Sequence, residues 1–147
     1  MKRELGTQSG VRPAGGQPAP AREVGGLAAL MGREVPLGDY HATLRRAARA
    51  LAINPLVYAE VSIRFERIED LEDALPEEDF LRLPLPWEAA FLAGKCFVRY
   101  RRRRGPRRSP LPDFYIGAHA AVAGLTLLTR DATRYRTYFP GLEIIAP

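Results

Sequence analysis

The sequence has little of the chemistry on which many small proteins depend. It contains a single cysteine, Cys96, which excludes a disulfide framework and a cysteine-rich zinc site. Its two histidines, His41 and His119, are too few for a typical histidine metal centre. No apolar run reaches the roughly 18 residues of a membrane-spanning helix, and the N-terminus lacks the apolar stretch of a signal peptide. We therefore expect a soluble cytoplasmic protein with no membrane partner, in which carboxylates would bind any metal.

Lysine is also scarce. Of the 22 basic residues only Lys2 and Lys95 are lysine, and with 17 acidic residues the net charge is +5. Two explanations of the arginine excess stay open: selection for phosphate-binding guanidinium groups, or the codon usage of a GC-rich genome. The charges are also unevenly spread, because residues 61–80 carry eight acids and residues 95–108 carry eight bases and no acid. These segments could pair with each other, or the basic one could face RNA or DNA.

The length of 147 residues suits one compact domain, and an apolar content of 46% is enough to form its core. Strand and helix signals alternate from residue 51 onward. This alternation predicts an α/β fold, a three-layer α/β/α sandwich around a mostly parallel sheet, with Trp87 and Phe91 in the core. The expected strands are 51–53, 80–85, 125–129 and 142–145, and the expected helices are 40–51, 55–65, 66–74, 76–79, 86–102, 112–123 and 131–138.

Three acids stand out by their context. Glu60 lies in an apolar helical stretch, Asp113 follows the helix-opening Pro112, and Asp131 follows the expected strand 125–129. The carboxyl edge of a parallel sheet would bring them together. Carboxylates without a nearby histidine or thiol suit Mg²⁺ or Mn²⁺, which favour phosphodiester hydrolysis. The alternative is structural: Asp113 would complement a helix dipole and Asp131 would cap a helix.

Four segments carry a family resemblance. They are residues 53–61 (INPLVYAEV), 111–120 (LPDFYIGAHA), 127–131 (LLTRD) and the closing 138–145 (YFPGLEII). In this order they resemble a PIN domain of the VapC-type toxin class, over residues 50–147. The resemblance implies an endoribonuclease dependent on Mg²⁺ or Mn²⁺, which is the toxin of a type II toxin–antitoxin system. Its implied partners are an RNA substrate, a cognate antitoxin protein and a second copy in a homodimer.

The resemblance also implies roles for individual residues. Glu60, Asp113 and Asp131 correspond to metal-binding catalytic acids of the family. Thr129 corresponds to an accessory polar group near the metal.

The front of the chain departs from the family, which begins with a central strand ending in an aspartate. Residues 1–50 contain no apolar strand followed by aspartate, and Asp39 follows a proline-containing stretch unsuited to a central strand. We therefore divide the chain into a disordered or aberrant segment, 1–40, and a PIN-like domain, 41–147, without its first strand and first metal ligand. Such a chain should be poorly stable and impaired as a nuclease. The alternative function is a catalytically inactive PIN-like protein that binds RNA or the antitoxin.

The bases of residues 95–108, here called the basic run, end one expected helix and enter the loop before Asp113. These arginines could attract RNA phosphates in a salt-sensitive way, or could simply be solvated at a helix C-terminus. The RNA-binding hypothesis covers Arg99, Arg101, Arg102, Arg103, Arg104, Arg107 and Arg108. We interpret His119 and Cys96 as packing residues.

Overall fold

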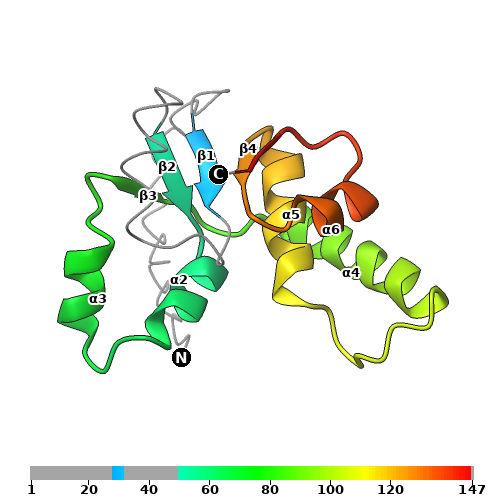
Figure 1. Ribbon diagram of the computed structural model, residues 1–147, viewed down its shortest axis with the longest axis horizontal. Coiled ribbons are helices and arrows are strands. Elements are labelled where there is room, and N and C mark those ends of the chain that lie inside the picture. The colour runs from blue at the N-terminus through cyan, green and yellow to red at the C-terminus, as the bar shows by residue number, and fades with distance from the viewer. Residues whose placement is uncertain (1–27, 32–49, 147) are drawn as a thin grey trace, which may run out of the picture.

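The computed structural model describes residues 28–31 and 50–146 (Figure 1). Its strands form one parallel sheet in the order β3-β2-β1-β4-β5. This arrangement confirms the expected α/β fold with a parallel sheet. The strands are β1 Ala28–Met31, β2 Ala50–Ile53, β3 Phe80–Arg82, β4 Thr126–Leu128 and β5 Ile144–Ile145.

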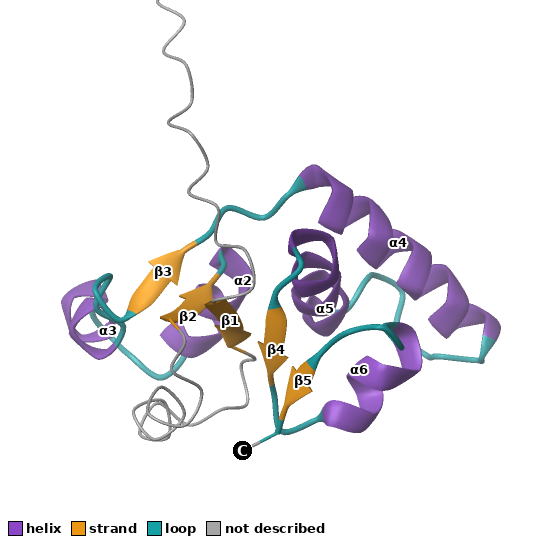
Figure 2. Ribbon diagram, turned by 90° about the horizontal axis from the view of Figure 1, so that it is seen from above, coloured by secondary structure: helices purple, strands orange, loops and turns teal. Residues whose placement is uncertain are grey.

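The helices lie close to their expected positions, and α4 and α5 pack side by side on one side of the strands (Figure 2). Residues 76–79, expected to be helical, instead form a turn, and most of the expected helix 40–51 lies outside the described residues. In the described ranges no helix is long and apolar enough to cross a membrane. The helices are α2 Pro55–Ser62, α3 Ile68–Ala74, α4 Trp87–Arg102, α5 Pro112–Ala123 and α6 Ala132–Tyr138.

The inner strands β2 and β4 are buried along almost their whole length. Leu51, Ala52 and Ile53 are at most 1% exposed, and every residue of β4 is buried. Parallel strands that are covered on both faces read as continuous apolar runs, which is why the sequence predicts them well. Two helices begin at the prolines that were predicted to start them, α2 at Pro55 and α5 at Pro112.

The prediction that the chain has no first strand is wrong, because β1 occupies the centre of the sheet. Ala28–Met31 pairs in parallel with β2 and β4, and Leu30 lies opposite both Ala52 and Leu127. The sheet therefore includes residues before the boundary predicted at residue 41. The inner edges of β2 and β4 are paired, which removes the reason for expecting poor stability. The rest of residues 1–40, including Asp39, lies outside the described part of the chain.

The prediction that Trp87 and Phe91 lie in the core is also wrong. They are 88% and 68% exposed, respectively. The buried positions of α4 are the small residues Ala89, Ala93 and Cys96, which follow helical spacing and allow close packing on α5. Large aromatic residues therefore indicate the wrong face of this helix, whereas the expected burial of Cys96 is confirmed.

Candidate active site

Short polar side chains organise the carboxyl edge of the sheet. Asn54 follows β2 and caps α2, accepting hydrogen bonds from the backbone N–H groups of Leu56 and Val57 at 3.1 and 3.0 Å. Asp131 follows β4 and caps α6, where its Oδ1 accepts from the backbone N–H of Arg134 at 3.3 Å. Such caps satisfy helix N–H groups that have no partner inside the helix. The structural role expected for Asp131 is therefore present.

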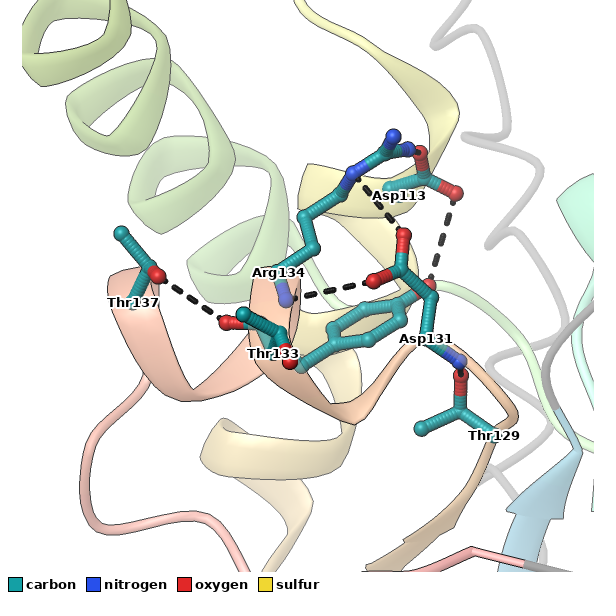
Figure 3. A network of polar contacts seen from close by, with 7 residues as sticks. Asp113, Thr129, Asp131, Thr133, Arg134 and Thr137 are labelled. Carbon is teal, nitrogen blue, oxygen red and sulfur yellow. Dashed lines mark hydrogen bonds and ion pairs between the residues drawn. The ribbon is translucent and has the colours of Figure 1, made fainter.

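Asp113 and Asp131 are brought together, as predicted, by a guanidinium group that lies between them (Figure 3). Nη1 of Arg134 donates to Oδ2 of Asp113, and Nε lies 3.1 Å from Oδ2 of Asp131. The hydroxyl of Tyr135 donates to Oδ1 of Asp113 at 3.5 Å. Asp113 is only 4% exposed, and burying a carboxylate is costly unless it has a positive partner and hydrogen-bond donors. Arg134 and Tyr135 supply both.

Arg134 carries a permanent positive charge into the site. Burial lowers its pKa, but the hydrogen bond to Asp113 and the negative charges of Asp113 and Asp131 raise it, and the net pKa lies above its usual value. Its side chain is still 44% exposed, and that of Asp131 is 42% exposed. Solvent therefore reaches this half of the network, while Asp113 forms its buried end.

Sequence reasoning missed Arg134 and Tyr135. The spacing of Asp131 and Arg134, three residues apart at the start of a helix, is a signal for their ion pair. No comparable local signal joins either residue to Asp113, because that contact depends on the packing of α6 against α5.

Thr129 supports Asp131 through the backbone. Its hydroxyl oxygen accepts a hydrogen bond from the N–H of Asp131 at 3.1 Å, and its own N–H donates to the carbonyl of Ile145 at 3.0 Å. The side chain is fully buried. Thr129 therefore fixes the turn that carries Asp131 out of β4, which suits a positioning role.

Glu60 lies half-buried on α2, a helix that contacts α5. Within residues 28–31 and 50–146 no group of three or more His, Cys, Asp or Glu side chains is placed to hold one metal ion. The described residues thus bring Asp113 and Asp131 together without gathering Glu60 into the same cluster, and its role as a metal ligand stays a prediction. Strand β1 contains no carboxylate, and Gly32 follows it in the sequence.

A cleft of about 700 Å³ opens beside Asp113. Asp113 and Arg134 line it together with Tyr100, Arg107 and Tyr138. Arg107 is the member of the predicted RNA-binding run that lines this cleft. A cleft of this size is large enough for a nucleotide-sized ligand, since small-molecule sites commonly measure about 300–1,000 Å³.

Other arginines of the basic run make contacts within the protein. Arg99 donates to the carbonyl of Tyr138 at 2.6 Å, and Arg101 donates to the carbonyls of Gly105 and Arg107 at 2.7 and 3.0 Å. The acidic helix α3 and the C-terminal end of α4 lie at opposite ends of the molecule (Figures 1 and 2). The acidic and basic segments therefore do not pair directly in the described structure.

No curated protein sequence matches this chain, but several solved structures share its fold. A chain in the crystal structure of VapBC2 from Rickettsia felis bound to a promoter DNA fragment has a TM-score of 0.63 and 16% identity, covering 81% of this chain and 98% of that one. For VapBC-1 from nontypeable Haemophilus influenzae these values are 0.62, 15%, 82% and 98%. For VapBC-5 from Mycobacterium tuberculosis they are 0.53, 21%, 82% and 99%. A family model for the PIN domain matches residues 27–140, a span that includes β1, and the chain therefore belongs to the PIN domain family.

Proposed function

We propose that this chain is an endoribonuclease dependent on Mg²⁺ or Mn²⁺ and is the toxin of a VapBC-type toxin–antitoxin pair. The observation that carries the proposal is the meeting of Asp113 and Asp131 around one positive group, at the carboxyl edge of a parallel sheet. Membership of the PIN family and the likeness to chains of VapBC complexes support it. A cognate antitoxin and a second copy in a homodimer are the partners that belong to this proposal.

The donor groups of the site fit a hard divalent cation. Asp113 and Asp131 offer carboxylate oxygens, the ligands that Mg²⁺ and Mn²⁺ prefer, and both already contact the same cationic group. We assign Glu60 as a third ligand by its correspondence with the family motif. When bound, the ion would activate a water molecule and neutralise charge on the phosphodiester.

The residues around the aspartates would position the ligands and attract the substrate. Tyr135 orients the buried carboxylate of Asp113, and Thr129 holds the turn that carries Asp131. Arg107, on the wall of the same cleft, provides a charge for an RNA phosphate. The chain would thus hold a phosphodiester beside the carboxylate of Asp113.

The proposal is tested with a single-stranded RNA substrate in Mg²⁺, in Mn²⁺ and in EDTA. We expect cleavage only with a metal, and we expect Asp113→Asn to reduce the rate by about 100-fold or more, since it removes a ligand charge with little change in volume. Asp73→Asn, at an exposed position on α3, is the matched control and should cleave like the unmodified chain. Cleavage that persists in EDTA, or that survives Asp113→Asn, would contradict the proposal.

A second candidate is a non-catalytic protein that binds RNA or the antitoxin. It is favoured by the absence of a carboxylate in β1 and by the guanidinium of Arg134 on both aspartates. In the same experiment this candidate predicts RNA binding, measured by fluorescence anisotropy, without cleavage in either metal. Binding without cleavage would replace the first proposal by this one.

A further inference from the structure

Arg134 contacts both Asp113 and Asp131, the two aspartates that would share a bound cation in the proposed function. One guanidinium nitrogen contacts an oxygen of Asp113 and another lies 3.1 Å from an oxygen of Asp131, so a single group holds both carboxylates. Figure 3 shows this guanidinium beside the Asp113 carboxylate, with Asp131 facing it from the start of α6. The two carboxylates and one guanidinium together form a compact, charge-assisted network.

A divalent ion bound by the two aspartates would lie close to the positive guanidinium of Arg134 and be repelled by it. The repulsion is strong next to a carboxylate as buried as Asp113, because little solvent screens the charges there. Asp113 and Asp131 would hold Mg²⁺ through carboxylate oxygens, and one oxygen of each already contacts Arg134. The ion and Arg134 therefore draw on the same carboxylate oxygens.

The contacts around Arg134 would allow its guanidinium to move away from the two aspartates. Arg134 lies on the short helix α6, and 44% of its side chain is exposed, so its charge can be solvated after release. Asp113 keeps the hydroxyl of Tyr135, and Asp131 keeps its capping bond to the backbone of α6. These contacts would hold both carboxylates in place after the guanidinium moves.

We propose that Arg134 competes with the divalent metal: it joins Asp113 and Asp131 in the metal-free chain and has to release them when the ion binds. This inference rests on the proposed function, because it presumes that the two aspartates are metal ligands. Arg134 is then a positioning residue, and it raises the metal concentration that is needed to fill the site.

The test measures Mn²⁺ affinity by isothermal titration calorimetry in the full chain, without RNA. Arg134→Gln should lower the Kd for Mn²⁺ by about three- to tenfold, since a charge-assisted contact no longer opposes the ion. Arg136→Gln is the matched control: Arg136 is exposed on the same helix, and among the described residues it shows no ion pair. The control should bind Mn²⁺ like the unmodified chain.

Thermal unfolding gives a second readout. Without metal, Arg134→Gln should melt at a lower temperature, because Asp113 loses its cationic partner; added Mn²⁺ should then raise its Tm by more than it raises that of the unmodified chain. Arg134→Lys serves if the glutamine variant does not fold. Lysine keeps the charge but lacks the planar fork that spans two carboxylates, so its Mn²⁺ affinity should rise by a smaller factor.

An unchanged or weaker Mn²⁺ affinity in the Arg134 variants would overturn the competition. Failure of the proposed function looks different, because then the unmodified chain would not cleave RNA in a metal-dependent way. If metal-dependent cleavage is lost in Asp113→Asn while the Arg134 variants bind Mn²⁺ no more tightly, the nuclease proposal stands and the inference about Arg134 fails.

Discussion

The side-chain amide of Asn54 donates a hydrogen bond to Nδ1 of His119 at 3.2 Å, joining the start of α2 to α5. Oδ1 of Asn54 already accepts two backbone hydrogen bonds, so the amide presents its NH₂ group to the ring. Nδ1 must therefore be the unprotonated acceptor. Both residues are 2% exposed, which agrees with the interpretation of His119 as a packing residue.

We expect the stability of the protein to fall in mild acid because of His119. Burial lowers its pKa below the ordinary 6.5, so the unfolded chain takes up a proton before the folded chain does. Neutral His119 therefore contributes fully to stability above about pH 6.5. This contribution is lost as the pH falls from there toward the lowered pKa of the folded chain, by at most about 1.4 kcal/mol per pH unit. Urea unfolding at about pH 7.5 and about pH 5.5 measures the loss. His119→Gln, which cannot titrate, should reduce the difference between the two values, and an equal difference would show that another group is responsible.

Gly117→Ala should destabilise the protein and loosen the candidate site. A Cβ at this position of α5 would lie 2.7 Å from Cδ2 of Phe139 and 2.9 Å from Cδ1 of Tyr135, both of which are buried. Overpacking of this kind costs about 1–3 kcal/mol and would push α6 away from α5. Denaturant unfolding gives the stability, and the Mn²⁺ titration described above reports the effect on the aspartates.

Gly94→Ala is the matched control in the neighbouring helix. Among the described residues, nothing outside the adjoining backbone of α4 lies within 4 Å of a Cβ built at Gly94, which is in the interior of that helix. Since alanine favours a helix over glycine by about 1 kcal/mol, this variant should be more stable than the unmodified chain. A loss of stability at both glycines would mean that the close approach at Gly117 is not the cause of its effect.

Arg104→Gly should stabilise the protein although it removes a charge. Arg104 follows the end of α4 with a φ of 64°, in the left-handed region that costs a residue with a Cβ about 1–2 kcal/mol. Glycine adopts this conformation freely, so the free energy of unfolding should rise by about 1 kcal/mol, after allowing for the greater entropy of the unfolded chain. Arg102→Gly, at the last position of α4, should lower it instead. A lower stability in both variants would refute the prediction.

The basic run should separate into arginines that bind RNA and arginines that hold the fold. Arg107→Gln should weaken RNA binding and reduce the slope of log affinity against log salt by about 0.7, the value for one contact to a single strand. Arg99→Gln should instead lower the Tm, because Arg99 donates to the carbonyl of Tyr138 and its guanidinium carbon lies 5.8 Å from the centre of that ring. If both variants reduce the salt slope equally, Arg99 contacts RNA as Arg107 does, and the predicted separation is wrong.

Much of the fold after residue 50 was predictable because its signals are local. Buried parallel strands are short apolar runs, and Pro55 and Pro112 mark helix starts. Strand β1 gave no such signal: Ala28–Met31 contains two alanines and no β-branched residue, and pairing with partners on both sides stabilises it as a strand. Local propensity could not reveal a strand that depends on its neighbours.

The candidate site was also predictable only in part. The proximity of Asp113 and Asp131 followed from the rule that the carboxyl ends of parallel strands share one edge. The bridge through Arg134 did not follow, because it needs the packing of α6 on α5 and the direction of one long side chain. The exposure of Trp87 likewise depended on which face of α4 meets α5, a choice made by small residues.

The central place of β1 also bears on how the sheet can form in time. In the described part of the chain, β2–β3 and β4–β5 form two half-sheets that are joined only through β1, and the partners of β1 in β4 come about a hundred residues later. Contacts that distant form slowly, because a long stretch of chain must be ordered first. During synthesis, the first strand of the sheet therefore has one side open until the last quarter of the protein has been made. A nascent chain that ends before β4 has only one half-sheet, and the carboxylates of Asp113 and Asp131 meet only when the other half is added.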